Sequence, residues 1–276
     1  MNQNINRNLI IKFLLITFAI SWSCFGLLAV LNNADIITYT AGFPLIMIGA
    51  FGPGIAAIML QEKRTPNAIV KFIFSGTYRH FPYLILFGAL LGATFWVPTQ
   101  ELNPYGPPLF AFPVVLLVQT IFTGGQEEVG WQGFLRPSLE KHMPFPAAVL
   151  LLSVIWAVWH LPIWFIDGSP QQHINFGVYF IMVLVFSFPL SVLHKKTSNV
   201  FYCCLLHGLV NTFAAYFAFG EQWIRIQEGS LVNWGVIFGG AVVIAVSLLV
   251  WHFDKSKAML SDVDHINCGK ASSSAL

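Results

Sequence analysis

The chain contains apolar segments that recur along almost its whole length of 276 residues, separated by short polar connections. Each is long enough to cross a hydrocarbon core of ~30 Å. A backbone surrounded by lipid must satisfy its own hydrogen bonds, so such segments are expected to be helices. The sequence therefore predicts an all-α polytopic membrane protein with about eight transmembrane helices. We place them near residues 9–31, 42–60, 81–98, 109–127, 145–166, 176–194, 199–219 and 232–253.

The composition supports a lipid environment. Only 9% of the residues are charged and 56% are hydrophobic, whereas about 25% are charged in a soluble domain. So few charges cannot cover the surface that a soluble protein of this size exposes. The net charge of +2 gives no electrostatic basis for binding nucleic acid. We therefore expect the lipid bilayer as a partner and no nucleic acid.

The basic residues predict an orientation for the helices. With the N-terminus in the cytoplasm, 13 of the 14 Lys and Arg residues fall in cytoplasmic segments, and only Arg225 falls outside. Cytoplasmic loops of membrane proteins carry such an excess of basic residues. We therefore predict that both termini are cytoplasmic.

No change of composition indicates a domain boundary within the apolar part of the chain. We expect one transmembrane domain over residues 1–253. Residues 254–276 are polar and end in SSSAL, which is typical of a disordered terminal tail.

A few ionisable residues lie inside the predicted spans, where a carboxylate costs about 2.5–3.5 kcal/mol on insertion scales. Glu127 and Glu128 close the fourth span, His160 lies in the fifth, and His207 lies in the seventh with Asn211 four residues later. A hydrated interfacial pair or a hydrogen-bonded clamp between helices would explain the carboxylates structurally. The accompanying histidines and amide favour a reactive or transport role.

This residue set has the chemistry for hydrolysing a peptide bond. A Glu that is hydrogen-bonded to a neutral His can deprotonate a water molecule. His207 and Asn211, at positions i and i+4, share a helix face and can donate to a developing oxyanion. Counting along ideal helices places Glu127 and His207 roughly 12–14 Å deep and His160 at about 20 Å. Three groups are thus expected to converge, whereas His160 requires a tilted or displaced helix.

The same atoms admit a metal. Glu127, His160 and His207 would form the two-His-one-carboxylate set of a hydrolytic zinc site. The sequence lacks H-E-x-x-H and would draw the ligands from three helices. We therefore expect a site without cofactor or metal, with zinc as the alternative.

Three ordered motifs resemble the CAAX-protease and bacteriocin-processing family of intramembrane endopeptidases, which includes the type II CAAX prenyl endopeptidases. The motifs are EEVGWQ from Glu127, WAVWH ending at His160, and HGLVN from His207. FGPGIAAIM in the second span is also similar, and the resemblance runs over residues 43–215. It implies that Glu127 and His160 activate the water, that His207 and Asn211 stabilise the oxyanion, and that Glu128 is a supporting carboxylate.

One position departs from the family pattern. The family has an Arg where this chain has Gln132, and a Gln can hydrogen-bond to Glu128 but cannot neutralise it. Arg136 lies on the same helix face but about 12 Å further along by rise. Reduced activity, altered pH dependence or loss of activity are all compatible with this change.

We therefore expect an intramembrane endopeptidase in a bacterial cell membrane, with a cavity open to the cytoplasmic side. Its substrate would be a peptide or protein, and the resemblance includes lipidated ones. A non-catalytic bacteriocin self-immunity factor or scaffold of the same fold is the alternative. A proton- or ion-coupled transporter is a third reading, because buried carboxylates also mark ion pathways.

Overall fold

The computed structural model describes residues 3–95, 103, 106–217 and 234–273, and all the elements it defines there are helical. Six helical segments are long and apolar enough to cross a membrane, and two shorter apolar helices accompany them. The predicted all-α fold is therefore confirmed, whereas its orientation stays a prediction. The helices are α1 (Gln3–Asn33), α2 (Tyr39–Ala50), α3 (Gly52–Met59), α4 (Pro66–Phe74), α5 (Phe81–Phe95), η1 (Leu109–Ala111), α6 (Phe112–Ile121), η2 (Gly125–Glu127), α7 (Glu128–Gly130), η3 (Trp131–Leu135), α8 (Arg136–Leu139), α9 (Phe145–Trp159), η4 (Leu161–Phe165), η5 (Pro170–His173), α10 (Phe176–Thr197), α11 (Val200–Tyr216) and α13 (Trp234–Ser273).

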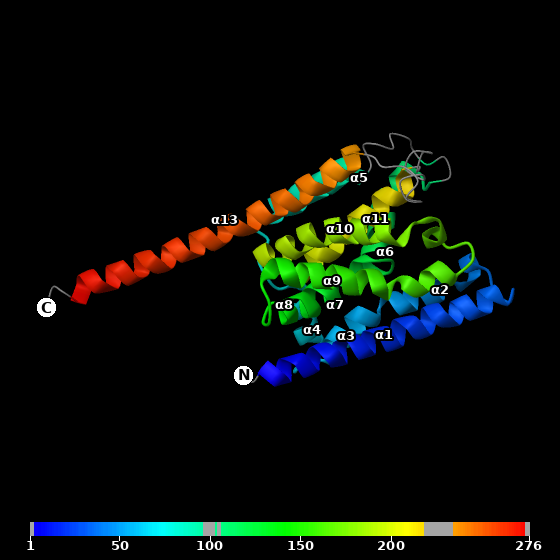
Figure 1. Ribbon diagram of the computed structural model, residues 1–276, viewed down its shortest axis with the longest axis horizontal. Helices are drawn as coiled ribbons and strands as arrows, with labels where there is room; N and C mark the ends of the chain where they lie inside the picture. The colour runs from blue at the N-terminus through cyan, green and yellow to red at the C-terminus, as the bar shows by residue number, and fades with distance from the viewer. Residues whose placement is uncertain (1–2, 96–102, 104–105, 218–233, 274–276) are drawn as a thin grey trace.

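The helices pack lengthwise into a bundle (Figure 1). Helix α1 packs against α2 and α3, α10 lies between α9 and α13, and α11 packs against α6. Large aromatic side chains, including Trp131, Trp159 and Phe25, are fully buried between them. Many apolar side chains instead point outward, as expected for a surface that faces lipid; examples are Leu15, Val30, Ile85, Val114, Ile181 and Phe238.

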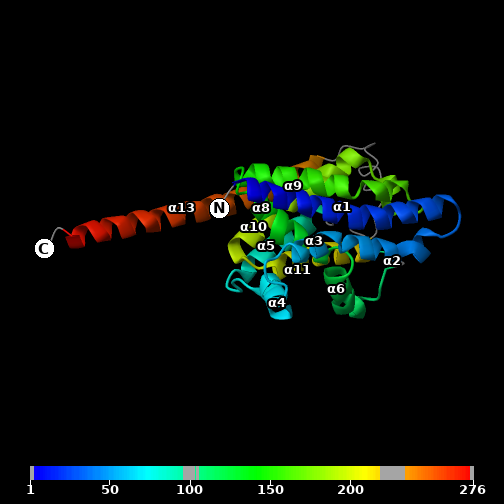
Figure 2. The ribbon, with the colours of Figure 1, turned by 90° about the horizontal axis from the view of Figure 1, so that it is seen from below.

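Because the spans alternate in direction, their connections gather at two opposite ends of the bundle. Helix α1 begins at one end, where α8 and the junction of α10 with α11 also lie, and α13 projects beyond it (Figure 1). The connection between α1 and α2 and the segment between α9 and α10 lie at the other end (Figures 1 and 2). We call these the terminal end and the loop end.

The fourth predicted span is not one continuous helix. Helix α6 ends at Ile121, and Gly124 has φ +135° before the chain re-enters a 3-10 turn, a short α-turn and the π-helical turn η3. Only glycine adopts this backbone conformation without steric cost. The break therefore occurs where the sequence reads FTGG, and it displaces the two glutamates from a regular helix.

The last helix is longer than its predicted span. The backbone of α13 continues as helix to Ser273, beyond the apolar segment that ends at Phe253. We had expected a disordered tail from Asp254. The disorder of this tail and the single domain over residues 1–253 stay predictions.

Candidate active site

The structure brings four of the five predicted residues to one cavity. Glu127 ends η2, His160 follows the last residue of α9, and His207 and Asn211 lie on α11. All four line a cavity of about 780 Å³. Glu128 is fully buried behind them.

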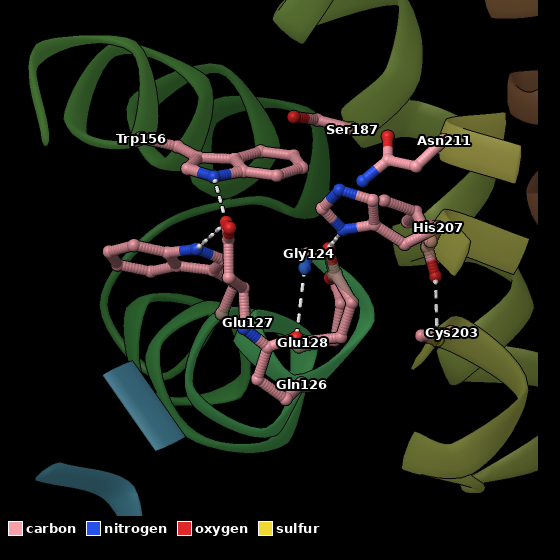
Figure 3. Close-up of polar contacts among 12 residues, drawn as sticks. Gly124, Gln126, Glu127, Glu128, Trp156, Ser187, Cys203, His207 and Asn211 are labelled. Atoms are coloured by element: carbon pink, nitrogen blue, oxygen red, sulfur yellow. Dashed lines mark hydrogen bonds and ion pairs between the residues drawn. The ribbon is translucent and has the colours of Figure 1, made fainter. Parts of the chain in front are cut away.

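The carboxylate of Glu127 is held by two indoles. Its Oε2 accepts hydrogen bonds from Trp156 Nε1 at 2.8 Å and from Trp131 Nε1 at 3.4 Å (Figure 3). Both donors meet the same oxygen, and in the described part of the chain no protein donor contacts Oε1. The side chain is thus fixed at the cavity wall with one oxygen available to a water molecule.

Glu128 makes the carboxylate–histidine contact of the site. Its Oε1 lies 2.8 Å from His207 Nδ1 (Figure 3). Glu128 is fully buried, and the His207 residue is only 6% exposed. The family resemblance implied that Glu127 acts together with His160 and that Glu128 is a supporting carboxylate. In the structure, the direct carboxylate–histidine contact is between Glu128 and His207, whereas Glu127 accepts hydrogen bonds from two indoles.

Helix α11 directs two nitrogen atoms to one point beside Gly124. A Cβ atom built on Gly124 would lie 2.3 Å from Asn211 Nδ2 and 2.9 Å from His207 Nε2. Asn211 Nδ2 also donates to the carbonyl oxygen of Thr123 at 2.8 Å. The lack of a Cβ on Gly124 therefore lets these two side-chain nitrogens pack directly against the glycine backbone and next to each other.

The turn that carries the glutamates is anchored on both sides. Gln126 Oε1 accepts from the Gly124 backbone N–H at 2.9 Å, and Gln126 Nε2 donates to the Phe122 carbonyl at 3.2 Å. Across the bundle, a Cβ on Gly130 would lie 2.4 Å from the Pro53 side chain. This close approach of α3 and α7 explains why small residues occur in both segments.

His160 reaches the cavity because α9 ends at this point. Its Nδ1 lies 2.9 Å from the Trp156 carbonyl oxygen, and its ring packs edge-on against Trp159 and Tyr179. Counting along an ideal helix had placed His160 deeper in the membrane than Glu127. In the structure, both residues nevertheless line the same cavity.

The cavity walls are mainly apolar and aromatic. Three helices line it with residues at helical spacing, so each presents one face. The lining residues used below are Tyr39, Phe43, Ile46 and Met47 of α2, Tyr179, Met182 and Phe186 of α10, and His207, Val210, Asn211 and Ala214 of α11.

Gln132, which replaces the family Arg, is fully buried beneath the site. Its Oε1 accepts hydrogen bonds from Arg136 Nε at 3.1 Å and from Ser191 Oγ at 3.2 Å. Arg136 also bonds to Glu140 at 2.7 Å and contacts His194. The nearest guanidinium in the sequence thus binds Gln132 Oε1. Among the described residues, neither Glu128 Oε2 nor Gln132 Nε2 makes a hydrogen bond of normal geometry, although the Gln132 side chain interacts with the Glu128 carboxylate.

Catalysis without a metal, with zinc as the alternative, stays a prediction for this site. Within the residues that the structure describes, no group of three or more His, Cys, Asp or Glu side chains is arranged to hold a metal ion. Glu127 Oε2 is engaged by two indoles, and His160 Nδ1 by a backbone carbonyl. The reaction proposed below is written without a metal.

Sequence reasoning missed three features of the site. Trp131 lies four residues after Glu127, and this i and i+4 spacing could have identified it. Gly124 could have been recognised from the FTGG break. Tyr179 lines the cavity next to His160, but no sequence motif distinguishes it.

Comparison with known proteins identifies relatives of this chain. A family model described as Type II CAAX prenyl endopeptidase Rce1-like matches residues 109–213, which carry all five predicted residues. The chain is also 23% identical to the protein named CAAX prenyl protease 2 of Methanococcus maripaludis. That alignment covers 79% of this chain and 87% of the archaeal protein.

The fold and the comparisons support a multi-pass membrane peptidase of the CAAX prenyl protease type. The predicted resemblance is confirmed: residues 109–213 match the model of the Rce1-like type II CAAX prenyl endopeptidases, and the chain is similar to the archaeal CAAX prenyl protease 2.

Proposed function

We propose that this protein hydrolyses a peptide bond with a water molecule activated by Glu127. The observation that carries this proposal is the position of Glu127, His207 and Asn211 around one cavity. One wall supplies a carboxylate oxygen, and another supplies two nitrogens that converge beside Gly124. A scissile carbonyl placed between them would meet a base on one side and donors on the other.

The proposed reaction needs only this chain, water and substrate. Glu127 takes a proton from the water, whose oxygen bonds to the carbonyl carbon as the carbonyl electrons move onto its oxygen. When this intermediate collapses, the C–N bond breaks and the proton passes to the leaving nitrogen. His160, on the same cavity wall, assists Glu127 in positioning the water.

His207 and Asn211 stabilise the negative oxygen of the intermediate. With one proton shared between Glu128 Oε1 and His207 Nδ1, the other ring nitrogen, Nε2, carries a hydrogen and donates. Glu128 therefore fixes the orientation of the ring and supports its donor role. Asn211 donates from an amide that is already oriented by the Thr123 carbonyl.

The test is turnover of a peptide or protein substrate by the purified protein in lipid nanodiscs. Glu127→Gln and His207→Ala are expected to abolish turnover, while Glu62→Gln, a change of the same type at an exposed position, is expected to preserve it. Equal turnover in all variants would show that Glu127 and His207 are not catalytic residues.

A non-catalytic role, such as bacteriocin self-immunity or scaffolding, is the second candidate, and Gln132 favours it. The family Arg is absent, and the buried Gln132 binds Arg136 instead. Protection of cells against a bacteriocin that persists unchanged in the Glu127→Gln variant would support this alternative.

The proposed substrate is a peptide or protein, and the proposed location is a bacterial cell membrane. Our expectation of a cytoplasmic opening conflicts with our predicted orientation, because residues at the loop end line the cavity. Therefore the cavity cannot open to the cytoplasm if both termini are also cytoplasmic.

A further inference from the structure

We infer that the cavity opens to the non-cytoplasmic side and receives an apolar peptide segment of an exported or outer-leaflet protein. This inference rests on the proposed function for its substrate, and on geometry and charge for its direction. It replaces the cytoplasmic opening that we expected from the sequence.

The mouth of the cavity is formed by residues of the loop end. Tyr39, the first residue of α2, lines the cavity together with Gln171, His173 and Ile174 between α9 and α10. His173 is exposed to solvent. By contrast, no residue from 61–80, 136–144 or 195–199 is among the described residues that line it.

The terminal end beneath the site is closed by packed side chains. Trp131, Gln132 and Leu135 are fully buried, and Arg136 is 2% exposed. The Arg136 guanidinium is bonded to Gln132, Glu140 and His194. Lys195 Nζ lies 2.9 Å from Glu140. A peptide could not reach Glu127 from this end without separating these contacts.

The distribution of Lys and Arg indicates that the terminal end and the loop end lie on opposite sides of the membrane. Ten of the 14 Lys and Arg residues lie in the parts of the chain that reach the terminal end: the first part of α1, the segment from α3 to α5, α8 with the connection that follows it, and the end of α10. They are Arg7, Lys12, Lys63, Arg64, Lys71, Arg79, Arg136, Lys141, Lys195 and Lys196. The described connections of the loop end, 34–38 and 166–175, contain Asp35 and Asp167 and no Lys or Arg. Basic residues remain in the cytoplasm during membrane insertion. The closed end is therefore cytoplasmic and the mouth is not.

The walls specify the chemistry of the occupant. Phe43, Ile46 and Met47 of α2 and Met182 and Phe186 of α10 all line the cavity. Apolar walls with a few polar groups bind apolar ligands and orient them through those groups. An apolar peptide segment in the outer half of the bilayer fits this lining, whereas the C-terminal tail of a cytosolic protein could not enter by the mouth.

Cysteine labelling in intact bacterial cells tests the direction of the mouth. A cysteine is introduced at His173 or at Lys141 in a Cys24→Ser, Cys268→Ser background, which retains only the buried Cys203 and Cys204, and each protein is labelled with a membrane-impermeant maleimide. Both positions are exposed, the first at the mouth and the second at the terminal end. We expect His173→Cys to react in intact cells and Lys141→Cys to react only after lysis. Protection of His173→Cys before lysis, or reaction of Lys141→Cys in intact cells, would overturn the inference.

These labelling patterns do not require catalysis, so they separate the inference from the proposed function. If His173→Cys is labelled from outside but the protein cleaves no substrate, the proposed peptidase function is refuted. The inferred direction of the cavity opening would still hold. For the active protein, a membrane-anchored reporter with its apolar segment on the non-cytoplasmic side is expected to be cut. Preferential cleavage of the mirror-image cytoplasmic reporter would overturn the substrate assignment.

Discussion

His207 Nδ1 lies 2.8 Å from Glu128 Oε1, inside the protein and away from bulk water. This contact joins α11 to the short helix α7, although the two residues are 79 positions apart in the chain. It fixes one nitrogen of the imidazole and leaves Nε2 next to Gly124. The two consecutive glutamates therefore have different partners, and we expect their substitutions to have different effects.

Replacement of Glu128 is expected to act through His207. Glu128→Ala leaves the buried Nδ1 without its partner and should lower kcat by about 10²–10³-fold, similar to the loss of one oxyanion donor. Glu128→Gln preserves a hydrogen-bonding group and should lose less. The measurement is steady-state turnover, with folding checked by thermal unfolding. Equal loss in both variants would show that the charge, and not the hydrogen bond, is required.

Asn211→Leu is expected to reduce kcat by about 10²–10³-fold with little change in KM. The reason is that an oxyanion donor acts mainly in the transition state. The measurement is a substrate-concentration series. A rise in KM at constant kcat would instead assign Asn211 to ground-state substrate binding.

Gly124→Ala is expected to impair both stability and activity. The added Cβ would lie 2.3 Å from Asn211 Nδ2, at a backbone φ of +135°, and such strain costs about 1–3 kcal/mol. Gly26→Ala is the matched control, because nothing lies within 4 Å of the added Cβ there. Unfolding in detergent and turnover are measured for both. An unimpaired Gly124→Ala protein would contradict the arrangement of the turn.

The two indoles that hold Glu127 are expected to contribute unequally. Trp156 Nε1 is 2.8 Å from the carboxylate and Trp131 Nε1 is 3.4 Å away. A hydrogen bond to a charged group contributes about 1.5–3 kcal/mol. Trp156→Phe should therefore reduce kcat/KM by roughly ten- to a hundredfold, and Trp131→Phe should reduce it less. A larger loss in Trp131→Phe would contradict this order.

Removal of divalent metals is expected to leave turnover unchanged. The described residues offer no cluster of metal ligands, and the proposed reaction uses Glu127 as its base. The purified protein is assayed before and after extended dialysis against a chelator. Activity that disappears on dialysis and returns with zinc would restore the alternative of Glu127, His160 and His207 as ligands.

Hydropathy determined the transmembrane architecture, because lipid restricts every span to a helix and apolar segments are visible directly in the sequence. The motifs around Glu127, His160 and His207 also identified the region that the family model matches. The helix break at Gly124 was harder to predict from the sequence. A glycine pair permits a turn, but the surrounding packing decides whether the turn forms.

The sequence by itself determined that the chain is a helical membrane protein and which polar residues enter its interior. Only the tertiary structure decided that Glu128 pairs with His207, that Glu127 is held by Trp131 and Trp156, and that the cavity is lined from the loop end. Hydropathy and periodicity describe each helix alone. The choice of partner depends on where a broken helix places two adjacent carboxylates against elements up to 79 residues away.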